Sequence, residues 1–234
     1  MSMIPRDVSS ARRRGALRVL AAGLAFAAVT VGCVAILHVR GTIPAARLLK
    51  DPGVFNPGPW YLGAVSYFGI ALWTAACAVT LFSRTLLRND ENAELRRFLL
   101  ASGLLSALLG TDDLFMLHDT IAPQLLGISE KAVIGVYGLL GLAYAIRFRS
   151  LILRTELLLL VSAIAFFGLS VCVDVLDADD ARLLLVEDGA KLAGITQWFS
   201  YLASTSAAAI RGTLGAAGRH GEPELPEHAA TAAL

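Results

Sequence analysis

Charged residues are scarce in this sequence. They make up 17% of its 234 residues, whereas a soluble domain of this length carries about 25%. Hydrophobic residues make up 56%, the mean hydropathy is +0.65, and the apolar residues come in long stretches. These features exclude an ordinary soluble domain and indicate an integral membrane protein. With a net charge of +1, the overall charge gives no reason to expect a nucleic-acid partner.

Cysteine and the common metal-site motifs are also scarce. The three cysteines, Cys33, Cys77 and Cys172, stand singly in apolar stretches, and no C-x-x-C pair marks a zinc or redox site. In residues 108–119, the one histidine does not stand four residues from a carboxylate in the way that a helical H-E-x-x-H zinc site requires. The sequence shows no internal repeat, which counts against a typical carrier.

Six apolar stretches predict an all-α membrane helix bundle. They cover residues 16–38, 60–82, 98–118, 132–146, 157–177 and 190–210, and most approach the ~20 residues that cross a ~30 Å hydrocarbon core. Each should be a helix, because a helix satisfies its own backbone hydrogen bonds in lipid. We expect three regions: a basic N-terminal segment, residues 1–15; a six-helix transmembrane domain, residues 16–211; and a disordered cytoplasmic tail, residues 212–234.

The distribution of lysine and arginine predicts the orientation of this bundle. Fourteen of the 20 basic residues fall before or at the start of the first stretch, up to Arg18, in the second–third and fourth–fifth connections, and from Arg211 onward. The other six belong to the remaining connections. Because cytoplasmic connections carry the excess of positive charge, we expect a plasma-membrane protein with both termini in the cytoplasm.

Acidic residues interrupt the third apolar stretch, where residues 108–119 read LLGTDDLFMLHD. A helix long enough to cross the membrane must continue through Asp112 and Asp113 to about Leu117. Asp112 then lies roughly 21 Å along the axis from Phe98, in the outer half of the bilayer. Ionisable groups at that depth face protein or a water-filled cavity and are candidates for function.

Two other helices carry acidic groups to the same level. Asp174 and Asp177 fall at the end of the fifth stretch, at a helix C-terminus, where the helix dipole disfavours negative charge. Glu187 and Asp188 precede the sixth stretch. We therefore expect a polar cluster in the outer half of the bundle that contains Asp112, Asp113, His118, Asp119, Asp174 and Glu187.

Carboxylates and imidazole together predict a metal site or an acid/base site. The candidate ligands for a divalent metal such as Zn, Mn or Fe are Asp112, His118, Asp119, Asp174 and Glu187. His38 is a possible second nitrogen ligand. We expect Asp113 and His118 to be the catalytic residues, which would activate water against a lipid-like or other small-molecule substrate.

Structural explanations of the same residues remain open. Glu187 and Asp188 are suited to a helix N-terminus, and Lys191 can pair with Glu187 one turn later. Asp112 or Asp113 can form an interhelical hydrogen bond or an ion pair with Lys191. The cluster would then only hold helices together in a membrane scaffold.

Transport is the other open interpretation. Intramembrane carboxylates relay protons or bind cations in many transporters, so the chain is also a candidate for a proton- or cation-coupled transporter or an assembly subunit. A helix break at Gly110–Thr111 would fit the discontinuous helices of such proteins.

The segments DDLFMLHD (residues 112–119) and EDGAKLAGITQW (residues 187–198) resemble two segments of an uncharacterised family of small multi-pass bacterial membrane proteins. Members of this family carry D-D-L-F-x-L-H-(D/E) in one helix and E-D-G-x-K in a later one. The resemblance implies a multi-pass helical fold and assigns no activity. Membrane hydrolases related to alkaline ceramidases also combine several spans with an acid/His site, but this sequence lacks their H-x-x-x-H pair.

Overall fold

A computed structural model describes residues 6–49, 63–87, 92–174 and 181–220, and these parts of the chain contain helices and no strand. The all-α prediction is confirmed, and each of the six apolar stretches falls on a long helix. The elements are α1 (Arg6–Val39), α2 (Ala45–Leu49), α3 (Ala64–Leu86), α4 (Ala93–Phe115), the π-helix η2 (Leu117–Leu126), α5 (Glu130–Arg147), α6 (Arg149–Ile152), α7 (Leu157–Asp174) and α8 (Ala181–His220).

Four helices are long and apolar enough to cross a membrane: residues 14–39 of α1, and α3, α4 and α7. Large apolar side chains such as Val29, Phe82 and Leu139 are exposed on the outside of the bundle. Water would penalise this exposure, whereas lipid would not. The helices therefore suit a lipid bilayer.

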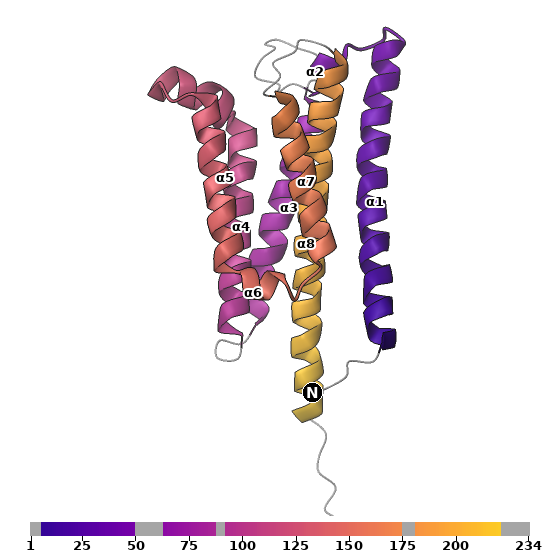
Figure 1. The fold of residues 1–234 in the computed structure, drawn as a ribbon, viewed down its shortest axis with the longest axis vertical. Coiled ribbons are helices and arrows are strands. Elements are labelled where there is room, and N and C mark those ends of the chain that lie inside the picture. The colour runs from indigo at the N-terminus through magenta and orange to yellow at the C-terminus, as the bar shows by residue number, and fades with distance from the viewer. Residues whose placement is uncertain (1–5, 50–62, 88–91, 175–180, 221–234) are drawn as a thin grey trace, which may run out of the picture.

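The long helices lie side by side, with α8 near the middle (Figure 1). α8 packs against α1, α3 and α7, and α3 also packs against α4. α1 forms one edge of the bundle, and α5 lies beside α4 at the other edge (Figure 1). The two ends of the described chain, Arg6 and His220, lie at the same end of the bundle, and α8 continues past residue 211.

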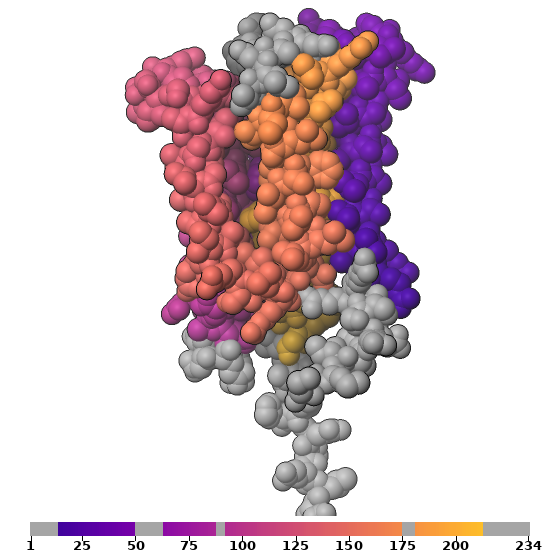
Figure 2. All heavy atoms as spheres, in the orientation of Figure 1, coloured from indigo at the N-terminus to yellow at the C-terminus, as the bar shows by residue number. Residues whose placement is uncertain are grey.

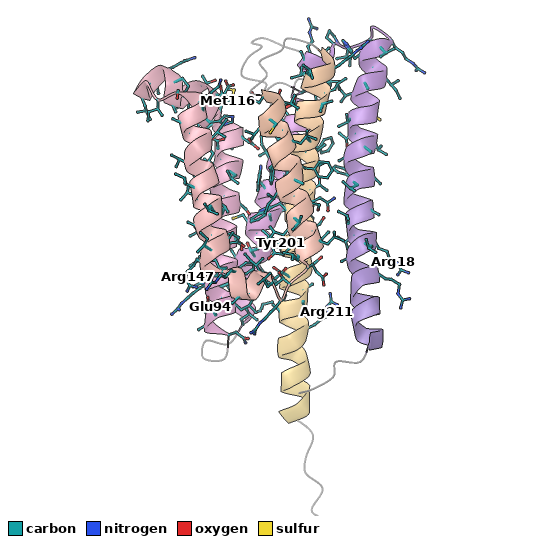
Figure 3. All side chains as sticks on the ribbon, in the orientation of Figure 1. Arg18, Glu94, Met116, Arg147, Tyr201 and Arg211 are labelled. Atoms are coloured by element: carbon teal, nitrogen blue, oxygen red, sulfur yellow. The ribbon has the colours of Figure 1, made fainter. Side chains whose placement is uncertain are left out.

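Aromatic side chains and an ion pair between helices hold the end of the bundle near the chain termini. Phe98 is fully buried and contacts the rings of Tyr144, Phe148 and Tyr201. Arg147 Nη1 donates to Glu94 Oε1 at 2.6 Å and joins α5 to α4. Figure 3 shows Arg147 and Glu94 together at this end, far from Met116. This packing fills the bundle at the end near the chain termini. The acidic residues predicted to form a cluster lie toward the opposite end.

Glycine lets α4 approach α3 closely. A Cβ atom at Gly110 would lie 2.8 Å from Trp73 Cβ, which belongs to the rigid base of that side chain. α4 is continuous through Gly110 and Thr111, so the break suggested at that point is wrong. The glycine allows a close helix contact, as small residues do in membrane bundles.

We expect Gly110→Ala to lower the melting temperature of the purified protein by several degrees. The added methyl group must push α4 away from Trp73, and overpacking of this kind costs about 1–3 kcal/mol. Gly138→Ala is the matched control, because no atom lies within 4 Å of a Cβ built at Gly138 on α5. Equal melting temperatures for the two variants would contradict the close α3–α4 contact.

Candidate functional site

Helix α4 ends earlier than the sequence predicted. The expected helix ran to about Leu117, but α4 ends at Phe115 and Met116 adopts the left-handed conformation (φ 52°, ψ 47°). The backbone N–H of Met116 donates to the carbonyl of Asp112 and closes the helix. The chain then continues as the π-helix η2, which contains Pro123. The turn at Met116 changes the direction of every residue after it.

The turn brings His118 back onto Asp112. In an uninterrupted α-helix, residues six apart point roughly 120° away from each other at 100° per residue. Here the backbone N–H of His118 donates to Asp112 Oδ1 at 2.9 Å, and the His118 Nδ1 atom hydrogen-bonds Asp112 Oδ2. Asp112 and Asp119 lie on different elements, α4 and η2, on either side of the turn.

Asp112 accepts a third hydrogen bond, from a residue of α5. The hydroxyl group of Tyr137 donates to Asp112 Oδ1 at 2.8 Å. Asp112 is only 4% exposed, and a carboxylate buried to this degree needs such donors. Asp112 therefore hydrogen-bonds both the ring and the backbone of His118, and its contacts link α4 to η2 and α5.

Asp113 points in a different direction from Asp112 and joins α4 to two other helices. Trp73 Nε1 on α3 donates to Asp113 Oδ2 at 2.9 Å, and Lys191 Nζ on α8 lies 2.8 Å from Asp113 Oδ1. The Trp73 ring stacks on Phe167 of α7, with ring centroids 5.9 Å apart. The ion pair between Asp113 and Lys191 is one of the structural alternatives left open by the sequence.

A cavity of about 550 Å³ lies at this end of the bundle. Five of the six candidate residues line it: Asp113, His118, Asp119, Asp174 and Glu187. Asp112 is not in the lining. His38, Glu130, Asp188 and Lys191 also face the cavity, as do apolar side chains of α2, α3 and α8. The structure thus brings residues from eight helical elements around one space, while their chemical roles stay predictions.

Two residues of α5 near the site, Glu130 in the cavity lining and Tyr137 beside Asp112, lie beyond what the sequence indicated. Glu130 and Tyr137 are seven residues apart on α5 and therefore share one face of that helix, which was the signal available for them. His38 Nδ1 accepts a hydrogen bond from the backbone N–H of Ala45 at 3.3 Å, so this atom caps α2. Asp177, which the sequence also placed near the site, lies outside the described residues.

The surroundings of His118 favour its charged form. Burial alone would lower the pKa of the imidazole, and the charge of Lys191 also lowers it. The hydrogen bond and negative charge of Asp112 oppose burial and prevail, so the pKa of His118 is raised. The Nδ1 atom is engaged by Asp112, which makes Nε2 the nitrogen available for proton exchange.

Three carboxylates face one another across the cavity. Burial raises the pKa of Glu130, and the negative charges of Asp174 and Asp119 raise it further. These three residues come from α5, α7 and η2, so three elements bring negative charge to one place. The cavity is therefore suited to a positively charged group.

In the described residues, the donors predicted for a divalent metal are not gathered around one point. Within those parts of the chain, no three side chains of His, Cys, Asp or Glu lie close enough together to hold one ion. Asp112 and His118 are bonded to each other, and Asp113 is engaged by Lys191 and Trp73. The arrangement instead provides an imidazole backed by a carboxylate, which is a general acid/base pair.

Comparison with known proteins gives a family without an assigned activity. No curated protein and no solved structure matches the chain. One protein family matches residues 16–205, which include α2 to α7, most of α1 and the cavity-lining half of α8. The chain therefore belongs to the family described as Domain of unknown function (DUF8692).

Proposed function

We propose that this protein is a six-span membrane hydrolase whose outward-facing cavity uses His118 as a general base on a lipid-like substrate. The observation that carries the proposal is the His118–Asp112 pair at the wall of a 550 Å³ cavity. An imidazole held by a buried carboxylate is a common arrangement for activating water or a hydroxyl group. Asp113, the other catalytic candidate from the sequence, would act through its ion pair with Lys191.

The chemistry would proceed in two proton transfers. A water molecule attacks the acyl carbon of the substrate, and its proton passes to His118 Nε2. The His118 imidazolium then gives this proton to the leaving alcohol or amine as the carbon–oxygen or carbon–nitrogen bond breaks. Asp112 stays ionised and stabilises the imidazolium, while the ammonium group of Lys191 favours negative charge on the acyl oxygen.

The topology is part of the same proposal. Residues 132–146 of α5 and the apolar half of α8 would complete six spans, with both termini in the cytoplasm of a cell whose plasma membrane holds the protein. Support comes from the basic residues: Arg18, Arg147 and Arg211 all lie toward the end of the bundle opposite Met116 (Figure 3). The positive-inside rule assigns that end to the cytoplasm, so the cavity faces outward.

A second candidate is proton-coupled cation transport, favoured by the interruption of α4 at Met116. Broken helices that expose backbone groups line the binding sites of many carriers. The packing of Trp73 on Phe167, and of Phe98 on Tyr201 farther along, fills the bundle beneath the cavity. A one-sided cavity suits an enzyme better than a carrier, so we place hydrolysis first.

We expect purified protein to hydrolyse long-chain fluorogenic acyl esters or amides in detergent micelles, and His118→Ala to reduce the rate 10²- to 10⁴-fold. Glu94→Gln is the control, because Glu94 lies at the opposite end of the bundle. His118→Gln checks that a loss in His118→Ala is not caused by unfolding, with melting temperatures measured for each protein. A His118→Ala protein with full activity would overturn the proposal.

The same assay tests the metal ligands suggested by the sequence. Hydrolysis that needs no metal should persist after dialysis against EDTA. Loss on dialysis and recovery with Zn, Mn or Fe would favour a metal held by Asp112, His118, Asp119, Asp174 and Glu187. No hydrolysis of any probe by folded protein would leave transport or a scaffold as the better account.

We expect Asp112→Asn to lower the pKa of His118, because asparagine keeps a hydrogen-bond acceptor and loses the negative charge. The midpoint is read from the rate at which diethyl pyrocarbonate modifies His118 as pH rises. It should lie above about 6.5 in the native protein, lower in Asp112→Asn and unchanged in Glu94→Gln. Equal midpoints in native and Asp112→Asn protein would remove Asp112 from this role.

Stability should follow the same titration. A raised pKa in the folded protein means that the Asp112–His118 pair stabilises fully below about pH 6.5. This stabilisation is lost as pH rises through the raised value. The difference in melting temperature between native protein and Asp112→Asn should therefore be largest near pH 5.5 and shrink toward pH 9.

The orientation is tested with two cysteines at opposite ends of α5. On a background without Cys33, Cys77 and Cys172, Ser129→Cys should react with a membrane-impermeant maleimide in intact cells and Ser150→Cys should not. Both serines are exposed, and 18 helical residues, roughly 27 Å, separate the two ends. The reverse pattern would invert the proposed topology.

A further inference from the structure

We propose that the ligand of this cavity is a single-chain amphiphile with a positively charged amine head, which enters sideways from the lipid between α5 and α7. The proposal rests on the cavity being the site of the proposed hydrolysis and adds the class of its substrate. Two observations carry it: an apolar furrow between these helices, and unpaired carboxylates at the end where the furrow meets the cavity.

The furrow separates α5 from α7 on one face of the molecule. Figure 2 shows it as a hollow between the pink atoms of α5 and the orange atoms of α7, with atoms of deeper helices visible in its floor. The backbone of α5 packs mainly against η2 and α6, and that of α7 against α8 and α1. α5 has no buried residue, so little holds it against its neighbour across the furrow.

Both walls are apolar along their membrane-spanning parts. The exposed surfaces of both helices are apolar here: α5 exposes Val136, Leu139 and Leu142 among others, and α7 exposes Val161 and Ile164. A hydrocarbon chain in contact with such side chains exchanges one apolar environment for another, so it can leave the bilayer without a desolvation penalty. A furrow that opens sideways to the bilayer in this way admits lipid molecules rather than water-soluble substrates.

The length of the furrow suits one extended chain. Its lower end is closed where Tyr144 of α5 packs against Trp198 of α8, with ring centroids 5.9 Å apart. Its upper end is marked by Glu130, the first residue of α5. The 14 residues from Tyr144 back to Glu130 span roughly 21 Å of helix, which is more than the ~15 Å hydrocarbon depth of one leaflet.

The charge at the upper end selects the head group. Glu130 begins α5 and Asp174 ends α7, so the two carboxylates flank the mouth of the furrow, and Asp119 of η2 faces them. In the described chain, no ion pair joins any of the three to a lysine or arginine. The described donors are too dispersed to chelate one small metal ion. An ammonium group can approach several dispersed carboxylates at once, whereas an anionic head would be repelled.

His118 lines the same cavity as these carboxylates. An amphiphile whose amine lies among Glu130, Asp174 and Asp119 would therefore hold a bond near its head group next to the general base. Its hydrocarbon chain would remain in the furrow. The charged head fixes orientation, and the chain supplies affinity, so the two features would position the reacting bond together.

Photocrosslinking tests both features. The probes are three C18 chains with a mid-chain diazirine and a terminal amine, alcohol or carboxylate, presented to the full-length protein in neutral-lipid nanodiscs. We expect the amine probe to label peptides of α5 and α7 at least tenfold more than the carboxylate probe, with little labelling of α1. Competition by unlabelled octadecylamine should remove the signal.

A charge-neutral variant supplies the contrast. Asp119→Asn/Glu130→Gln/Asp174→Asn should lose at least tenfold of the amine labelling and leave the alcohol labelling unchanged. Glu94→Gln should change neither. If the triple variant fails to fold by its melting curve, Glu130→Lys alone repeats the test with a single reversed charge.

The outcomes separate this inference from the proposed hydrolysis. His118→Ala should keep the amine labelling while losing turnover. Strong, charge-dependent labelling without hydrolysis by any probe would keep the binding proposal and overturn the catalytic one. Hydrolysis with equal labelling by the three probes, or labelling spread evenly over all helices, would overturn the amine and furrow proposal.

Discussion

Two neighbouring carboxylates on one helix, Asp112 and Asp113, impose the main constraint on this fold. Both are nearly buried, and a carboxylate buried to this degree needs hydrogen-bond or ion-pair partners within the protein. Because adjacent residues point about 100° apart on a helix, the two side chains must find partners in different directions. Asp112 is satisfied by His118 and Tyr137, and Asp113 by Trp73 and Lys191.

These two sets of contacts organise the polar end of the molecule. The Asp113 contacts join α3, α4 and α8, which form the packed centre of the bundle. The Asp112 contacts link η2 and α5 to α4 at the edge of the bundle (Figure 1). Breaking a buried pair by removing one partner usually costs several kcal/mol, so the same residues that could perform chemistry also hold the cavity walls.

The acidic residues in and beside the cavity fall into two groups, those paired with a basic side chain and those without such a partner in the described chain. Asp112 and Asp113 are committed to His118 and Lys191, whereas Asp119, Glu130 and Asp174 repel one another across the open space. Repulsion among unpaired carboxylates is unfavourable to folding and is relieved when a cation binds. This repulsion favours a positively charged ligand in the cavity. The apolar furrow beside the cavity favours a ligand that also carries a hydrocarbon chain.

Sequence patterning anticipated the helices well and the site only in part. Apolar stretches located all six long helices, because hydrocarbon surroundings demand continuous apolar side chains and self-satisfied backbones. The residues Asp113, His118, Asp119, Asp174 and Glu187 were selected by depth along their helices, and all five line one cavity. Helix depth says nothing about the direction of a side chain after a turn, so the pairing of His118 with Asp112 was missed.

What the sequence alone determined is the class of molecule: an all-helical chain suited to a bilayer, with acidic groups concentrated toward one end. What only the tertiary structure decided is which groups pair. The left-handed conformation of Met116 has no local sequence signal of the kind that glycine provides, and the partners Trp73, Tyr137 and Lys191 come from distant parts of the chain. Such contacts depend on how helices pack against one another, and helix packing is set by side-chain shape across several elements at once rather than by any one segment.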